Sequence, residues 1–225
     1  NIGADLRLVP AKPYKDPDNY VKYSGRLAEE LKKSNNKGVI WTNQFDNTAN
    51  YRGHYETTGK EIWEQTEGKI DGFICASGTG GTIAGVSNAL KEKNKNIKIY
   101  LSDPKGSCLY SYIKTKEFKS EGNSITEGIG SSRVTKNFEK ALIDGAYSID
   151  DTTALTVLFD LIEKEGLSLG TSSGINVAGA IRLAQELGPN KTIVTILCDK
   201  SDRYQGKLFN KKFLIEKNLP YPKWL

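Results

Sequence analysis

The chain has few residues of the kinds that build metal or disulfide sites. Among its 225 residues there are three cysteines and a single histidine, His54. Cys75, Cys108 and Cys198 are far apart and odd in number. This pattern favours reduced thiols in an intracellular compartment over a disulfide framework. No spacing among these residues is typical of a metal site, so we expect no metal.

Methionine is absent altogether, and the chain begins with Asn1. Translation starts with methionine, and that methionine is seldom removed before a residue as large as asparagine. We therefore expect the chain to be a piece of a longer protein. Any targeting signal would then lie upstream of Asn1.

Long apolar runs and blocks of like charge are absent as well. No apolar run reaches the roughly 20 residues that cross a bilayer, so we expect no transmembrane segment. The net charge of +5 comes from 32 basic and 27 acidic residues that are spread along the chain. Such a spread is typical of solvated helix faces, so we expect no nucleic-acid partner. The remaining composition, with 37% hydrophobic residues, is that of a globular protein.

The most informative stretch runs from residue 70 to residue 90, where the pattern predicts a strand, a glycine-rich turn and a helix. Residues 73–76 form a short apolar run that suits a parallel strand covered on both faces. Ile83, Val86 and Leu90 then follow at spacings of three and four. This spacing places one apolar stripe on a helix.

The turn between that strand and helix has the composition of a phosphate site. Gly78, Gly80 and Gly81 let the backbone turn sharply and bring its N–H groups close to a ligand. The free N–H groups and positive dipole end of the following helix favour an anion. Thr79 and Thr82 can add hydroxyl donors. The alternative is a plain tight connection between strand and helix, which motifs of this kind also fit.

Two familiar phosphate motifs do not fit this turn. A Walker loop needs a lysine before its Ser or Thr, and no lysine follows Gly81. A dinucleotide fingerprint needs G-x-G-x-x-G, a spacing that these glycines lack. The acid expected about twenty residues later is matched only loosely by Asp103.

Strand and helix patterns alternate along the rest of the chain, which predicts an α/β fold with a mostly parallel open sheet and helices on both faces. Strands are expected at residues 5–9, 39–42, 73–76, 97–101, 146–149 and 192–198. Helices are expected at residues 19–33, 58–66, 81–90, 109–118, 151–165 and 170–187. In the last of these helices, Val177, Ile181 and Ala184 are expected to face inward.

Three polar turns fall at strand ends or helix starts, at residues 78–82, 170–174 and 199–204. A polar, glycine-rich loop at residues 121–134 is long enough to be functional. Ligands of parallel sheets bind outside the carboxyl ends of the strands. The sequence therefore predicts a small-ligand site where these turns meet.

Taken together, these segments resemble the cysteine synthase family, whose members are pyridoxal-phosphate (PLP) enzymes of fold type II. The motifs that carry the resemblance follow in order: Gln44-Phe-Asp-Asn47, Glu56-Thr-Thr-Gly-Lys-Glu-Ile-Trp63, Gly78-Thr-Gly-Gly-Thr82, Glu127-Gly-Ile-Gly130, Gly170-Thr-Ser-Ser-Gly174 and Ile196-Leu-Cys-Asp199 through Tyr204. The tail from residue 209 resembles a branch that includes a fungal mitochondrial protein. The resemblance implies a homodimer, a mitochondrial or cytoplasmic location, a remnant of a smaller domain at residues 1–46 and a large PLP-binding domain at residues 47–225.

The resemblance also implies roles for individual residues. The cradle at residues 78–82 would hold the PLP phosphate, in agreement with the dipole argument. Gln44, with Phe45 beside it, would lie near the substrate carboxylate, and Gly128 would lie by the cofactor and the amino acid. The Schiff-base lysine of the family belongs to a segment upstream of Asn1, so we expect no catalytic residue in this chain and no turnover from it alone.

The residue expected at the pyridine end of the cofactor departs from the family pattern. Lys200 stands where family members usually have a serine that contacts the pyridine nitrogen. Ser201 or Asp199 could take that role, or Lys200 could point to solvent. Ser172 and Ser173 would pack near the far side of the ring.

For the full-length protein, the resemblance implies β-replacement, in which O-acetylserine and sulfide give cysteine and acetate. Two alternatives stay open. One is another PLP lyase, of the cystathionine synthase or dehydratase type. The other is a non-catalytic PLP-fold protein that serves as a binding partner, which the lysine at position 200 motivates.

Overall fold

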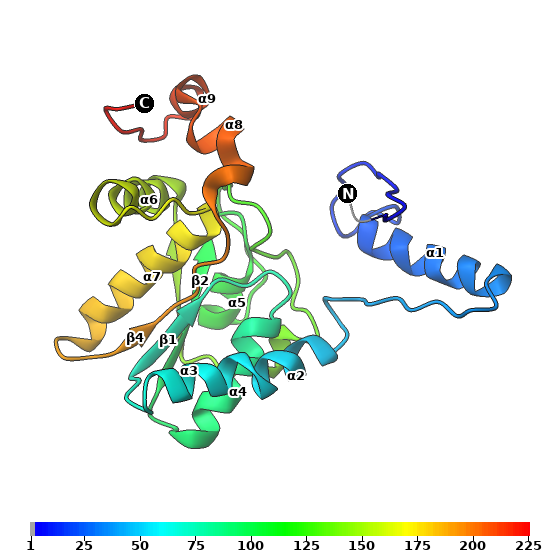
Figure 1. Ribbon diagram of the computed structural model, residues 1–225, viewed down its shortest axis with the longest axis horizontal. Helices are drawn as coiled ribbons and strands as arrows, with labels where there is room; N and C mark the ends of the chain where they lie inside the picture. The colour runs from blue at the N-terminus through cyan, green and yellow to red at the C-terminus, as the bar shows by residue number, and fades with distance from the viewer. Residues whose placement is uncertain (1–2) are drawn as a thin grey trace.

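The computed structural model describes residues 3–225, and its centre is a four-stranded sheet (Figure 1). The strands are β1 (Gly72–Cys75), β2 (Lys98–Pro104), β3 (Gly145–Ile149) and β4 (Ile193–Val194). Their order is β3-β2-β1-β4, and all three pairings are parallel. The predicted parallel α/β sheet is therefore confirmed.

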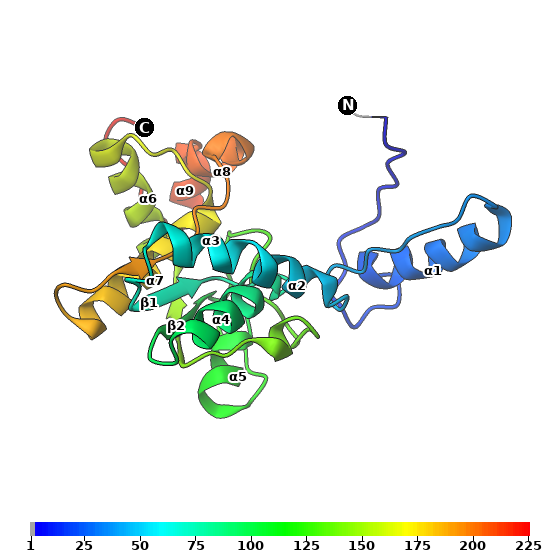
Figure 2. The ribbon, with the colours of Figure 1, turned by 60° about the horizontal axis from the view of Figure 1, so that its bottom comes forward.

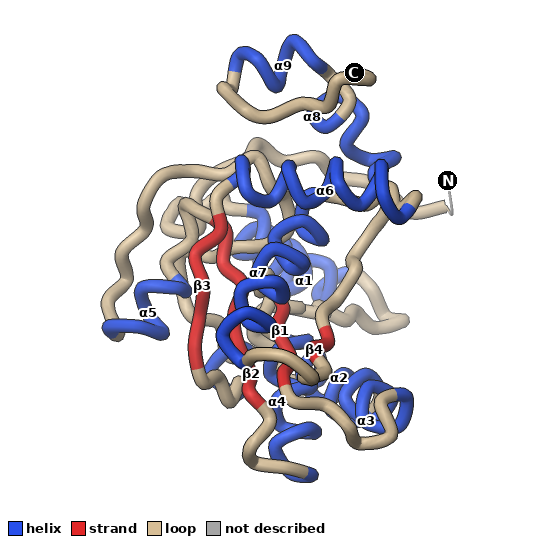
Figure 3. The backbone as a smooth tube through the Cα atoms, turned by 90° about the vertical axis from the view of Figure 1, so that its left-hand side faces the viewer, coloured by secondary structure: helices blue, strands red, loops and turns tan. Residues whose placement is uncertain are grey.

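Helices flank this sheet along its length. Their bounds are α1 Tyr20–Ser34, α2 Ala49–Glu56, α3 Thr58–Gln65, α4 Gly81–Lys93, α5 Leu109–Thr115, α6 Asp151–Glu165, α7 Thr171–Leu187, α8 Gln205–Leu208 and α9 Lys211–Glu216, with 3-10 turns at Phe138–Lys140 and Ser201–Tyr204. Figure 3 shows α7 crossing in front of the strands. No helix among residues 3–225 is both long and apolar enough to cross a membrane.

Alternation along the strands explains why helices cover both faces, because successive side chains of a strand point to opposite sides. Phe73 and Cys75 pack with Ile83 and Leu90 of α4 in one buried cluster. The other face receives α7, where Gly179 lies so close to the sheet that a Cβ atom would overlap the Ser102 side chain.

Several helix ends follow from local signals in the sequence. Helix α1 begins after Asn19, whose side-chain oxygen accepts a hydrogen bond from the Val21 N–H at 3.0 Å. Helix α6 begins after Asp150, which accepts from the Thr153 N–H at 2.8 Å. The same helix ends at Gly166, which has a φ of 68°.

Two of the expected strands are absent from the described residues. Residues 5–9 and 39–42 have extended backbone without strand pairing, and both predictions are wrong. Leu8 and Ile40 are 86% and 90% exposed. Strand-forming residues need a partner strand and a covered face, and neither segment has one here.

The strand expected at residues 192–198 is also shorter and less buried than predicted. Only Ile193 and Val194 pair with β1, because β4 is the edge of the sheet and one side of it carries no neighbouring strand. Beyond Val194, side chains replace the ladder: Thr195 Oγ1 donates to the Ile74 carbonyl at 2.7 Å. Cys198, predicted to be buried, is exposed.

Helix α7 packs on a different face from the one expected. The residues that are buried are Ile175, Ala178 and Leu183, whereas Ile181 is 45% exposed and Ala184 is exposed too. A stripe of small residues lets the helix approach the sheet closely, and this close fit outweighs the larger apolar side chains on the next face.

Helix α1 and its flanking segments lie apart from the sheet in two views (Figures 1 and 2). An extended connection joins them to α2 near residue 47. At the opposite end of the chain, α8 and α9 pack against α6 through a separate buried cluster. The body of the molecule therefore has the sheet at its centre, with an arm at the N-terminal side.

Candidate functional site

The predicted phosphate cradle lies between the end of β1 and the start of α4. Gly80 has a φ of 87°, and a Cβ atom there would come within 2.6 Å of the Phe138 backbone. Within the described residues, the N–H groups of Gly78, Thr79 and Gly80 donate to no backbone carbonyl. They are free to bind an anion at the positive end of the α4 dipole.

The two threonines of the cradle are already held by neighbouring side chains. Thr79 Oγ1 accepts from Asn50 Nδ2 at 3.0 Å and from the Gly81 N–H at 3.2 Å, which leaves its own proton available to donate. Thr82 Oγ1 lies 3.2 Å from His54 Nε2. Burial lowers the pKa of His54, which favours its neutral form.

The Gly-Ile-Gly loop lies directly against the cradle. The Gly130 N–H donates to the Ser77 carbonyl at 2.8 Å. A Cβ atom on Gly78 would overlap the carbonyl oxygen of Gly128, so only glycine allows this approach. Gly128 and Gly130 have positive φ angles of 79° and 81°. The structure thus brings Gly128 next to the cradle, as the resemblance implied.

The segment that contains Gln44 and Phe45 is joined to the same region by amide side chains. The Gln44 carbonyl accepts from Asn50 Nδ2 at 2.8 Å and from Asn137 Nδ2 at 3.0 Å. The Phe45 carbonyl accepts from Asn137 at 2.8 Å. Because Asn50 also binds Thr79, this segment is linked to the cradle through one side chain.

A hollow of about 460 Å³ opens on the other side of the Gly-Ile-Gly loop. Its lining residues are Glu127, Gly128, Ile129, Ser172, Cys198, Asp199, Arg203 and Tyr204. Tyr204 donates to Asp199 Oδ2 at 2.8 Å. Burial and this bond raise the pKa of Tyr204 to about 12, so its hydroxyl stays a donor.

The candidates for the pyridine end of the cofactor occupy different places. Lys200 is exposed and does not line this hollow. Ser201 is buried, and its hydroxyl pairs with that of Ser168 at 2.6 Å. Asp199 lines the hollow. Ser173, also expected near the ring, accepts from the Cys198 N–H at 3.0 Å.

Buried polar atoms without partners gather at this end of the sheet. Ser77 Oγ, Thr171 Oγ1 and Asp199 Oδ1 make no hydrogen bond to any described residue. Buried polar groups are normally paired. These atoms, together with the free N–H groups of the cradle, fit a polar ligand with a phosphate at one end.

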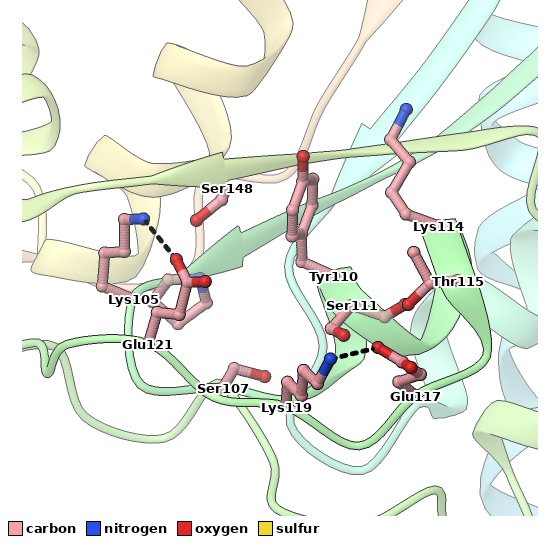
Figure 4. A pocket seen from close by; sticks show the side chains of 11 residues that line it. Lys105, Ser107, Tyr110, Ser111, Lys114, Thr115, Glu117, Lys119, Glu121 and Ser148 are labelled. Atoms are coloured by element: carbon pink, nitrogen blue, oxygen red, sulfur yellow. Dashed lines mark hydrogen bonds and ion pairs between the residues drawn. The ribbon is translucent and has the colours of Figure 1, made fainter.

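A second hollow, of about 290 Å³, lies away from the cradle beside α5 and the edge strand β3 (Figure 4). Two of its lysines are neutralised nearby, Lys119 by Glu117 at 2.6 Å and Lys105 by Glu121 at 3.9 Å. None of the predicted site residues lines it. We therefore place the functional site at the cradle.

Sequence reasoning missed the amides that hold the site together. Asn137 and Asn176 are almost completely buried. Asn176 Oδ1 accepts from the Ala76 N–H at 2.7 Å, just before the cradle. The available signal was an asparagine inside or beside an apolar helical pattern, where a buried amide requires several partners.

Comparison with known proteins agrees with this geometry. A family model described as pyridoxal-phosphate dependent enzyme matches residues 1–199. Cysteine synthase 1 of Neurospora crassa is 46% identical over 223 residues, which cover 97% of this chain and 58% of that protein. A Saccharomyces cerevisiae relative, named as a mitochondrial cysteine synthase, is 37% identical and covers 94% of this chain and 58% of its own length.

A solved structure is similar as well. The O-acetylserine dependent cystathionine beta-synthase from Helicobacter pylori matches with a TM-score of 0.71 and 31% identity, over 81% of this chain and 57% of that one. The chain therefore spans less than two thirds of the proteins it resembles. Since the family model covers most of its length, this chain belongs to the family of pyridoxal-phosphate-dependent enzymes.

Proposed function

We propose that the full-length protein is a cysteine synthase that converts O-acetylserine and sulfide to cysteine and acetate. The observation that carries the proposal is the 46% identity to a cysteine synthase across 97% of the chain. PLP, when bound, supplies the electron sink for such chemistry, and the protein supplies orientation and electrostatics. The free N–H groups of the cradle support a role in binding its phosphate.

The residues of this chain would position the two ligands. We propose that Gly78, Thr79, Gly80, Gly81 and Thr82 hold the phosphate. Gln44 would orient the substrate carboxylate with Phe45 beside it, and the backbone at Gly128 would border both ligands. These roles rest on the resemblance and on the short contacts that join the three segments.

At the pyridine end, the placement favours Asp199 over Lys200 and Ser201. Asp199 lines the hollow and has an unpartnered oxygen, whereas Lys200 is exposed and Ser201 pairs with Ser168. A carboxylate at the ring nitrogen would favour its protonated form, because opposite charges stabilise each other. Comparing the absorption spectra of the Asp199→Asn and Lys200→Ala proteins, each loaded with PLP, would distinguish these residues.

The decisive experiment uses the native full-length protein. Borohydride reduction and peptide mass mapping should place a pyridoxyl group on a lysine upstream of Asn1, and the unreduced protein should release cysteine from O-acetylserine and sulfide. Absence of both an adduct and cysteine would overturn the proposal. It would instead favour a non-catalytic protein that keeps the fold.

A second candidate reaction uses a thiol amino acid in place of sulfide. It is supported by the solved structure of an O-acetylserine dependent cystathionine beta-synthase that shares this fold at 31% identity. The same preparation should therefore be supplied with sulfide and with homocysteine in parallel. Faster turnover with homocysteine would replace the first proposal with the second.

The remaining expectations concern the whole protein. We propose a boundary between two domains near residue 46, which is supported by the separation of α1 from the sheet (Figures 1 and 2). A homodimer is proposed from the resemblance. A mitochondrial location is one of two proposals, with the cytoplasm as the other, and it draws on the mitochondrial relative.

A further inference from the structure

An ion pair joins two segments of the site that are far apart in the sequence. Arg133 Nη1 lies 3.0 Å from Asp46 Oδ1, and Arg133 Nη2 lies 2.8 Å from Asp46 Oδ2. The side chains are only 21% and 18% exposed. Two parallel bonds in a partly buried place fix both distance and direction, which a single surface pair does not.

Further contacts hold each partner in place. Asp46 Oδ1 also accepts from the Lys136 N–H at 3.0 Å. The Arg133 guanidinium lies 4.2 Å from the ring centre of Tyr14 and 5.8 Å from that of Phe45. Cation–π contacts of this kind orient a guanidinium. The hydrogen bond from Arg133 is the main cause that holds the pKa of Asp46 below its ordinary value.

Each partner stands beside a segment assigned to the site. Asp46 directly follows Gln44 and Phe45. Arg133 follows the Gly-Ile-Gly loop, and its own N–H donates to Ser131 Oγ at 3.1 Å. Since the Gly130 N–H binds the carbonyl before the cradle, the pair ties the Gln44 segment to the cradle through the loop.

We propose that the Arg133–Asp46 pair is a latch that positions Gln44 and Phe45 against the Gly128–Gly130 loop and so sets the affinity for the amino-acid substrate. Both are positioning residues, because each takes its partner's hydrogen-bonding capacity and neither touches the cradle. The inference rests on the proposed function for its substrate. The geometric part, the coupling of the two segments, stands on the contacts alone.

The test compares full-length variants loaded with PLP: Arg133→Lys, Asp46→Asn and the exchanged pair Asp46→Arg with Arg133→Asp. Arg133→Lys keeps the charge and loses the bidentate fork. We expect KM for O-acetylserine to rise about tenfold in both single variants, with kcat changed less than about threefold, because ground-state positioning is lost. The exchanged pair should recover at least part of the loss.

A matched control is the exposed pair of Arg26 and Asp18 on the N-terminal arm, whose atoms lie 3.1 Å apart. Arg26→Lys should leave KM unchanged. An unchanged KM in Asp46→Asn would overturn the latch. Loss in Arg133→Lys without loss in Asp46→Asn would also overturn it, since Arg133 would then bind the substrate carboxylate directly.

A second readout does not depend on turnover. Amide hydrogen exchange of the full-length protein should become faster in both segments 43–50 and 127–137 in each single variant, because each segment loses its anchor. Faster exchange in only the mutated segment would overturn the coupling. If the protein makes no cysteine, this readout still tests the latch while the proposed function fails.

Discussion

At the scale of single residues, the site depends on atoms that have no room or no partner. Gly78 has no space for a side chain against Gly128, and Ser77 Oγ and Asp199 Oδ1 are buried without hydrogen bonds. Both features cost stability in the absence of a ligand. They are the local expression of a site that is built around something else.

Gly78→Ala should therefore weaken PLP binding in the full-length protein. The added methyl group overlaps the Gly128 carbonyl and must push the loop away, which typically costs about 1–3 kcal/mol. A loss of about tenfold or more in PLP affinity is expected, measured by absorbance titration. Gly206→Ala is the matched control, because nothing lies within 4 Å of a Cβ atom there; equal affinity in both variants would contradict the argument.

Asp103 predicts a pH dependence of stability. It is fully buried at the end of β2, where Oδ2 accepts from the Tyr110 N–H at 2.7 Å and Oδ1 has no partner among the described residues. Burial raises its pKa from 3.8 to about 6. The folded state therefore binds more protons than the unfolded state between these values, and stability falls as pH rises from about 4 to 6.

Asp103→Asn should remove this dependence, which amounts to roughly 3 kcal/mol for a shift of about two pKa units. The check is the free energy of unfolding in urea at several pH values between 4 and 7. The variant should show the shallower decline across that range. Parallel pH profiles for both proteins would show that Asp103 is ionised in the folded state at little cost.

At the scale of elements, caps and glycines decide where helices begin and end. Asp150 accepts from the Thr153 N–H at 2.8 Å and from the Thr153 hydroxyl at 3.0 Å. Gly166 closes the same helix with its positive φ. These signals are local in sequence, which is why the bounds of α6 were predictable.

Asp150→Ala should destabilise the protein by about 1 kcal/mol, because the orphan N–H at the start of α6 loses its acceptor. Asp150→Ser retains an acceptor and should recover most of that loss. Thermal unfolding of the full-length variants measures both. Equal losses in the two variants would indicate that the charge of Asp150, rather than its capping bond, matters.

At the scale of the whole molecule, the C-terminal tail closes over α6. Leu214 is completely buried in a cluster with Leu158 and Phe159 of that helix. Lys207 in the same tail donates to the Ile125 carbonyl at 3.0 Å and also pairs with Glu127. The tail thus supports the loop that borders the site.

Leu214→Ala should cost about 2–5 kcal/mol, because a cavity is left in that cluster. Leu142→Ala serves as the comparison, since that side chain is 47% exposed. Urea unfolding should separate the two variants clearly. A loss below about 1 kcal/mol in Leu214→Ala would mean that the tail contributes little to the stability of the body.

The phosphate cradle and the parallel sheet could be predicted because their signals are short and local. Glycines in a strand–helix turn, apolar runs and helix caps are set by neighbouring residues. The strand at residues 192–198 and the inward face of α7 could not be predicted in the same way. Their burial depends on which strand is the edge and how closely Gly179 approaches the sheet.

The sequence by itself determined the order of elements, the glycine-rich cradle and the family to which the chain belongs, because each is written in contiguous motifs. Only the tertiary structure decided that Asp199, not Lys200, lines the hollow. It alone joined Asp46 to Arg133, which are 87 residues apart. The physical reason is that contacts across such distances depend on how packed elements fold back on one another, and no local pattern encodes that.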